Sequence, residues 1–113
     1  MASFKLTIRH GPSVDRESHS TLEEAITALR AHTERIREEG GLGEVAAFHT
    51  YEPGDRVNAR LEISTGRALR SRDAGIDVMG DGGLVPFRGG VTRKPLQPAS
   101  GETAYEVVEA ALR

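Results

Sequence analysis

Cationic and polar side chains alternate with apolar ones in two separate segments of this chain. The first segment carries Lys5 and Arg9, and the second carries Arg56, Asn58 and Arg60. Guanidinium groups bind phosphate and carboxylate oxygens through paired N–H donors. If these five side chains project from one sheet surface, they form a compact patch suited to an acidic protein surface or to a phosphate backbone. We therefore take them as candidate partner-binding residues.

The four histidines are the other side chains with chemistry suited to neutral pH. His10 and His49 share the parity of the apolar residues in two expected strands, so they would meet near one sheet end if those strands are neighbours. A histidine pair can bind a metal ion or transfer a proton. No third ligand is evident, and no His-x-x-x-His pattern occurs. We expect neither a metal nor another cofactor, and a pocket near His10 and His49 is an alternative site.

Motifs for covalent catalysis and for ion binding are missing from the sequence. The chain has no cysteine and no Gly-x-Ser-x-Gly, and its glycine-rich stretch near residues 80–90 lacks a following Gly-Lys-Ser or Gly-Lys-Thr. Asp73, Asp77 and Asp81 recur at four-residue steps, but a calcium loop needs denser oxygen ligands. We therefore lean against an enzyme and expect no catalytic residues.

Length and composition favour one small intracellular domain. At 113 residues the chain fits a single domain spanning residues 1–113. The lack of cysteine excludes disulfides and thiolate metal sites. No segment approaches the roughly 20 apolar residues of a membrane span, and no secretory signal is evident at the N-terminus. We expect a cytoplasmic protein without a membrane partner.

The charges are nearly balanced in total but uneven along the chain. The net charge of −2 argues against a strong general affinity for nucleic acid. Acidic residues dominate the expected helices, whereas basic residues gather in the expected strands and their connections. Those basic residues are Arg9, Arg56, Arg60, Arg67, Arg70, Arg72, Arg88, Arg93 and Lys94. A bipolar protein with one cationic face is therefore possible.

Strict alternation of apolar and polar residues predicts two strands, over residues 3–10 and 55–64. Their apolar positions are Phe4, Leu6, Ile8, Val57, Ala59, Leu61 and Ile63. Leu61 is therefore expected in the core, whereas Arg60 is expected on the opposite face. On this interpretation Leu61→Ala costs roughly 2–5 kcal/mol, and Arg60→Ala costs well under about 1 kcal/mol.

Weaker patterns predict further strands at residues 13–18, 44–52, 74–79 and 84–88. The charged segment 13–18 suits a sheet edge that must not aggregate. Pro53-Gly54 predicts that segment 44–52 forms a hairpin with the strand that follows it. Asp81-Gly82 predicts a type I′ turn between the last two strands. Residues 95–98 read as an extended linker.

Capping signals predict two helices. Ser20 and Glu23 have the spacing of a capping box, and Gly40-Gly41 would end the first helix near Glu39. Ser100 is the expected cap of a closing helix. The apolar stripes are Leu22, Ala25, Ile26, Leu29 and Ile36 in the first helix, and Ala104, Val107, Val108, Ala111 and Leu112 in the second.

These elements predict an α+β fold. The simplest architecture is a two-layer sandwich: a mainly antiparallel sheet of about five to six strands, with one long and one C-terminal helix on one face. The other sheet face stays open. The order of elements is loosely similar to that of small ribosome-associated stress factors and of double-stranded-RNA modules, a similarity of topology that implies no particular site.

We consider three hypotheses for the function of this fold. The leading hypothesis is a non-enzymatic binding or assembly domain that acts through its open sheet face or an edge strand, on a protein partner or on a second copy of itself. The first alternative is a nucleic-acid or ribosome-associated factor that uses the arginine-rich face. The second alternative is a small enzyme or ligand binder with a pocket near His10 and His49.

Overall fold

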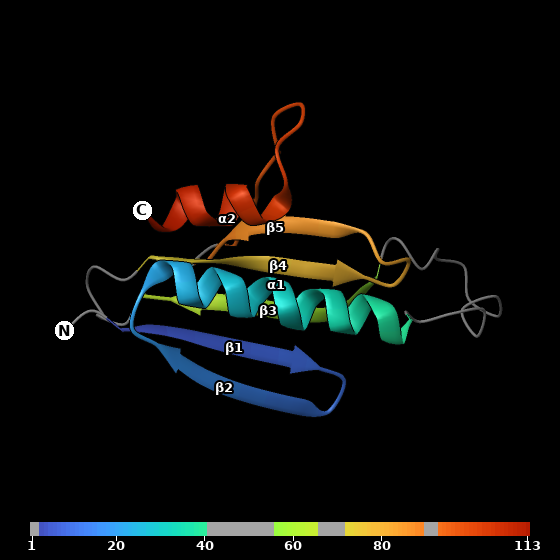
Figure 1. Cartoon of the computed structure of the whole chain (residues 1–113). Helices are drawn as coiled ribbons and strands as arrows, with labels where there is room; N and C mark the ends of the chain where they lie inside the picture. Colours follow the sequence, from blue (N-terminus) through green and yellow to red (C-terminus); the bar gives the residue numbers. More distant parts are fainter. Residues whose placement is uncertain (1–2, 41–55, 66–71, 90–92) are drawn as a thin grey trace, which may run out of the picture.

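A computed structural model describes residues 3–40, 56–65, 72–89 and 93–113. Within these ranges the expected α+β class and the antiparallel sheet are confirmed (Figure 1). The elements follow in the order β1 (Phe4–His10), β2 (Ser13–His19), α1 (Leu22–Glu39), β3 (Val57–Ser64), β4 (Asp73–Met79), β5 (Leu84–Arg88), β6 (Lys94–Pro95) and α2 (Ala104–Leu112).

The strands lie in the order β2-β1-β3-β4-β5-β6, and every neighbouring pair is antiparallel. The sheet therefore brings β1 and β3 together although a long helix separates them in sequence. Both edges of β3 are occupied, by β1 and by β4. The predicted hairpin between segment 44–52 and β3 falls on residues that the structure does not describe.

The predicted edge strand is confirmed as β2, which pairs with β1 alone among the described strands. A two-residue loop joins β1 to β2, with His10 opposite Ser13. Gly11 has a φ of 59°, a conformation that tight hairpin turns need and that glycine adopts without strain. Charged side chains along β2 protect this edge against pairing with other chains.

Helix α1 begins one residue later than the sequence predicts. Thr21, rather than Ser20, is the N-cap, and its hydroxyl accepts from the backbone N–H of Glu24 at 3.1 Å. The carboxylate of Glu24 accepts from the backbone N–H of Ser20 at 3.3 Å. The Ser/Thr-x-x-Glu spacing occurs twice in succession, at Ser20–Glu23 and at Thr21–Glu24. The motif alone therefore does not identify the first residue of the helix. Gly40 ends the helix as expected, with a φ of 91°.

Helix α2 also begins later than predicted, because Thr103 rather than Ser100 is its cap. The Thr103 hydroxyl accepts from the backbone N–H of Glu106 at 3.1 Å. The Glu106 carboxylate accepts from the backbone N–H of Thr103 at 2.9 Å, which completes a capping box.

The β4–β5 connection is a tight turn, but it is not of type I′. That type needs a positive φ at both central residues, whereas only glycines have a positive φ among the described residues. Gly82 N–H donates to the Met79 carbonyl at 2.9 Å, and the Asp81 side chain accepts from Gly83 N–H at 2.8 Å. Beyond β5, the segment expected to be a linker begins with the short strand β6.

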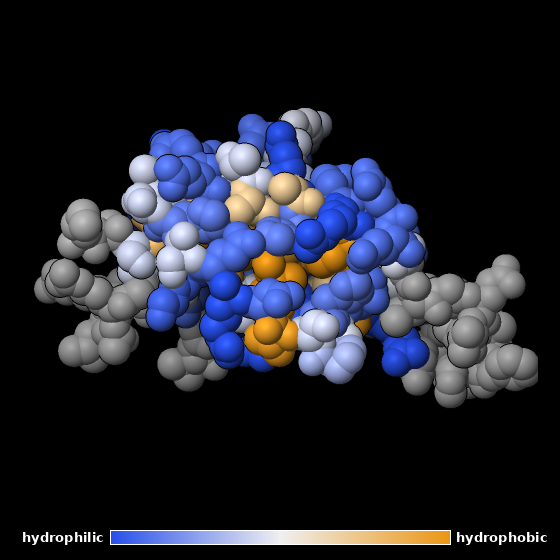
Figure 2. All heavy atoms as spheres, turned by 60° about the horizontal axis from the view of Figure 1, so that its bottom comes forward, coloured by the Kyte–Doolittle hydropathy of each residue, from blue (hydrophilic) through white to orange (hydrophobic). Residues whose placement is uncertain are grey.

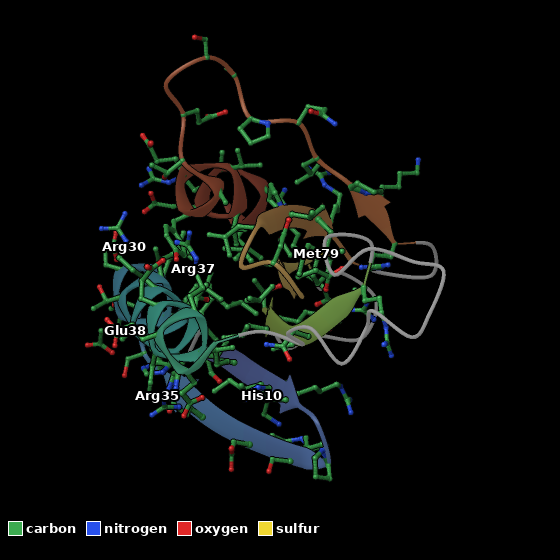
Figure 3. The ribbon with its side chains drawn as sticks, turned by 90° about the vertical axis from the view of Figure 1, so that its right-hand side faces the viewer. His10, Arg30, Arg35, Arg37, Glu38 and Met79 are labelled. Atoms are coloured by element: carbon green, nitrogen blue, oxygen red, sulfur yellow. The ribbon has the colours of Figure 1, made fainter. Side chains whose placement is uncertain are left out.

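The apolar core lies between the sheet and the two helices, which lie on the same side of the curved sheet (Figure 3). Its fully or nearly fully buried members include Leu6, Ile8, Ala25, Leu29, Ile36, Ala59, Leu61, Ile63, Ala74, Ile76, Val78 and Val108. The alternation in β1 and β3 thus predicted the buried face correctly, except at Val57, which is 42% exposed where the β3–β4 register shifts. No described helix is long and apolar enough to cross a membrane.

Candidate functional site

The sheet face opposite the helices carries three of the five predicted partner-binding residues. The register places Arg9 directly opposite Arg60, and Lys5 opposite Ser64. Lys5, Arg9 and Arg60 therefore project from adjacent strands on one surface, as the alternation predicted once β1 and β3 are neighbours.

The other two predicted residues lie at the periphery of this surface. Arg56 precedes β3, and its carbonyl accepts from Gly80 N–H at 2.7 Å, which places it beside the turn after β4. Asn58 lies where the β3–β4 register shifts between Val57 and Ala59. Arg56 therefore lies outside the strand that carries Arg60, and Asn58 lies at an irregularity of that strand.

Asp77 is the buried counter-ion of this face. Its side chain on β4 is only 4% exposed. Arg60 Nε donates to Asp77 Oδ1 at 2.7 Å, and Arg60 Nη2 donates to Oδ2 at 3.4 Å. Arg93 Nη1 also donates to Oδ2. The hydrogen bond that Arg60 donates to Asp77 raises the pKa of Arg60 above its ordinary value, against the opposing effect of burial. Arg60 is thus a fixed cation.

An aromatic ring supports the same two arginines. The guanidinium carbons of Arg60 and Arg93 lie 5.7 and 5.4 Å from the ring centroid of Phe87, within the range of cation–π contacts. Phe87 is fully buried although it projects from the face opposite the helices. We call Arg9, Arg60, Asp77, Phe87 and Arg93 the Arg60 cluster.

The Arg60 cluster retains hydrogen-bonding capacity. A guanidinium group has five N–H donors, and Arg60 gives two of them to Asp77. No other hydrogen bond from the Arg60 side chain occurs among the described residues. A carboxylate or a phosphate that approaches the open face would therefore meet donors whose direction is already set by Asp77.

Two carboxyl groups lie next to the Arg60 cluster. A Cβ atom on Gly89 would lie 2.5 Å from Glu62 Oε2 and 2.9 Å from Asp73 Cβ, so both side chains crowd the same point. Burial raises the pKa of Glu62 and Asp73 raises it further, whereas the charges of Arg60 and Arg9 lower it. The pKa of Glu62 is raised overall.

The predicted pairing of His10 with His49 cannot be followed, because His49 lies outside the described residues. His10 lies at the end of β1 (Figure 3), and its Nδ1 is 4.0 Å from a carboxylate oxygen of Glu39. Among the described residues, no group of three histidine or acidic side chains is arranged to hold a metal ion.

Two other histidines meet instead, through an acid that sequence analysis did not single out. Glu17 Oε1 lies 3.0 Å from His19 Nε2, and Glu17 Oε2 lies 2.6 Å from His32 Nε2. Arg35 Nη2 donates to His32 Nδ1 at 2.8 Å, which assigns Nε2 of His32 as the donor to Glu17. Burial raises the pKa of Glu17, but its bonds to both imidazoles lower it by more. These hydrogen bonds connect Glu17 and His19 of β2 with His32 of α1.

The exposed edge of β2 is poorly suited to symmetric self-pairing. In an antiparallel pair of two β2 strands centred on Arg16, Asp15 of one copy would oppose Glu17 of the other, and Arg16 would oppose itself. The surface on this side is largely hydrophilic, with apolar side chains visible in small areas (Figure 2). The charge pattern therefore favours a different partner over a second copy at this edge.

Arg60→Ala is expected to lower the free energy of unfolding by about 1–2 kcal/mol, because it leaves a buried carboxylate with one hydrogen-bonding partner fewer. This revises the value below 1 kcal/mol expected for a simple surface residue. Arg93 still binds Asp77 in the variant, which limits the loss. Urea unfolding measures the difference. Arg16→Ala on exposed β2 is the matched control, and an equal loss in both variants would contradict a structural role for Arg60.

Comparison with known proteins identifies no relative of this chain. No protein-family model, no curated protein and no solved structure matches it. The geometry of the Arg60 cluster and of the surrounding open face is therefore the basis for assigning a function.

Proposed function

We propose that this protein is a binding domain that holds an acidic segment of a partner protein on its open sheet face. The observation that carries the proposal is the position of Arg9 directly opposite Arg60. Cβ atoms of such cross-strand pairs are about 5 Å apart, and like charges there repel each other. A carboxylate placed between the two guanidinium groups removes this repulsion and gains charge-assisted hydrogen bonds.

Preorganisation of Arg60 supports the same proposal. A flexible arginine loses side-chain entropy when it binds a ligand, which weakens affinity by about 0.5–1.5 kcal/mol for each side chain fixed. Asp77 and Phe87 already hold Arg60 in place. Arg60 therefore loses most of its side-chain entropy during folding rather than on binding. More of the interaction energy with the ligand then contributes to affinity.

The chemistry of the face favours an acidic protein segment over nucleic acid. Glu62, Asp73 and Asp77 lie among the cations, and the whole chain has a net charge of −2. A continuous phosphate backbone would meet these carboxylates. Phe87, the aromatic residue of the cluster, is fully buried and is not available to stack on bases. A peptide with separated glutamates can place them on Arg9 and Arg60 alone.

The proposal is tested with a fluorescent peptide of alternating glutamate and serine, and with single-stranded RNA and duplex DNA of similar length. We expect the wild type to bind the peptide, with an affinity that falls as salt rises. Arg9→Gln should weaken binding about tenfold, the effect of one charge-assisted hydrogen bond. Arg9 is exposed, so its substitution leaves the contacts of Arg60 with Asp77 and Phe87 in place.

Arg30→Gln is the matched control, because it makes the same charge change on α1, away from the open face (Figure 3). Its affinity for the peptide should equal that of the wild type. Equal losses in the two variants would show only a general charge effect and would overturn the proposal. Tighter binding of RNA or DNA than of the peptide, with a steep salt dependence, would replace it with the nucleic-acid function.

A further inference from the structure

A second arginine-rich region lies beneath the last turn of α2, beside Asp73 and Gly89. A cavity of about 370 Å³ opens there to solvent. Its lining residues are Arg72, Asp73, Arg88, Gly89, Ala110, Ala111 and Arg113. The volume falls within the range of roughly 300–1,000 Å³ that is usual for small-molecule sites. Three arginines from three different elements therefore surround one space.

Two of these arginines have partners within the protein. Arg72 Nη1 donates to the backbone carbonyl of Arg113, at the end of α2. Arg113 Nη2 donates to Glu109 Oε2 at 3.1 Å. These contacts orient both side chains at the carboxyl end of a helix, where cations are favoured.

Arg88, the third arginine, has no partner of this kind among the described residues. It lies on β5 with an exposed side chain, and it makes no side-chain hydrogen bond or ion pair among the described residues. Among the described lining residues Asp73 is the one carboxylate, and Glu109 pairs with Arg113, so the positive charge of the three arginines is only partly compensated. A site with this balance attracts anions.

The remaining lining residues are small, which keeps the space between the arginines open. Gly89, Ala110 and Ala111 present little or no side chain to it. Gly89 also has to be glycine for packing, because a Cβ there would collide with Glu62 and Asp73. Small residues at these three positions therefore leave the space between the arginines open.

We propose that this cavity binds the phosphate or diphosphate group of a small molecule. Guanidinium groups match the geometry of phosphate oxygens and remain charged at all physiological pH values. Three of them offer N–H donors to several oxygen atoms of one group, which a phosphate or diphosphate supplies and a single carboxylate does not. This site is distinct from the Arg60 cluster, to which none of its lining residues belongs.

Isothermal titration calorimetry with inorganic phosphate and pyrophosphate tests the proposal. We expect saturable binding of one pyrophosphate per chain, tighter than that of phosphate, together with a higher melting temperature in its presence. Arg88→Gln should weaken pyrophosphate binding about tenfold or more. Because Arg88 is exposed and has no described partner, the melting temperature of the unliganded variant should match that of the wild type.

Two further variants separate the cavity from diffuse positive charge. Arg16→Gln removes the same charge from β2 and should bind pyrophosphate as the wild type does. Ala110→Leu keeps every charge but fills space at an exposed position that lines the cavity, and it should weaken binding. Absence of saturable binding to the wild type would overturn the proposal, as would equal losses in Arg88→Gln and Arg16→Gln. Unchanged binding by Ala110→Leu would also overturn it.

The Arg9→Gln variant allows the cavity proposal to be tested separately from the proposed function. It should lose the acidic peptide and retain pyrophosphate, whereas Arg88→Gln should retain the peptide. If Arg9→Gln alone weakens pyrophosphate binding, the anion lies on the open face and the cavity assignment is wrong.

Discussion

Leu61→Ala is expected to lower the free energy of unfolding by about 2–5 kcal/mol. Leu61 is fully buried at the centre of the sheet, where β3 lies between β1 and β4. Truncation removes apolar contacts to the helices and leaves a cavity that the surrounding backbone can close only in part. Chemical denaturation with urea, monitored by circular dichroism, measures this change.

Val57→Ala is the matched control for this prediction. Val57 begins the same strand, but it is 42% exposed, so its truncation should change the stability by only about 0.5 kcal/mol. If both variants lose the same stability, the one-sided burial of β3 is contradicted. The comparison uses one strand and one type of change, so differences in strand propensity largely cancel.

Gly75→Ala is expected to cost about 3 kcal/mol, at the upper end for overpacking a core. A Cβ atom at this position would lie 2.0 Å from the backbone oxygen of Leu61 and 2.8 Å from Glu62 Cα. Both are backbone atoms of β3, so the clash is relieved only if β3 and β4 move apart. Thermal and urea unfolding of the variant would show the loss.

Gly83→Ala provides the control for Gly75→Ala. The nearest atom to a Cβ at Gly83 is a carboxylate oxygen of Asp81, at 3.0 Å. This side chain is at a turn and can rotate away, so the cost should stay below about 1 kcal/mol. Equal destabilisation of the two variants would mean that β3 and β4 do not approach as closely as described.

The close approach at Gly75 also shapes the open face. Gly75 lies opposite Glu62, and it presents no side chain of its own to that surface. The carboxylate of Glu62 extends across to Gly89 and Asp73 instead. The acidic pair and the Arg60 cluster thus lie side by side because one strand position lacks a Cβ. A larger residue at Gly75 is therefore expected to disturb peptide binding as well as stability.

Only part of the candidate site follows from alternation in the sequence. Lys5, Arg9 and Arg60 lie at polar positions of clear strands, so a common open face could be predicted for them. The burial of Asp77 could not be predicted in this way, because the sheet face opposite the helices was expected to be open to solvent. An acidic residue between Ile76 and Val78 was the one available signal, since such a position is unfavourable for an unpaired charge.

The sequence by itself determined the elements that depend on near neighbours. Residues two apart in β1 and β3 fall on one face. The Ser20–Glu23 capping box and the Ser100 cap predicted the helix starts to within a few residues of the true caps, Thr21 and Thr103. These features arise from local geometry, which repeats every two residues in a strand and every 3.6 in a helix.

Tertiary structure alone decided which elements meet. The pairing of β1 with β3, the burial of Asp77 under Arg60 and Arg93, and the bridge from Glu17 to His32 each join residues far apart in the chain. Alternation fixes which side a residue faces but not which strand lies beside it, because strand order is set by the packing of all strands and both helices together.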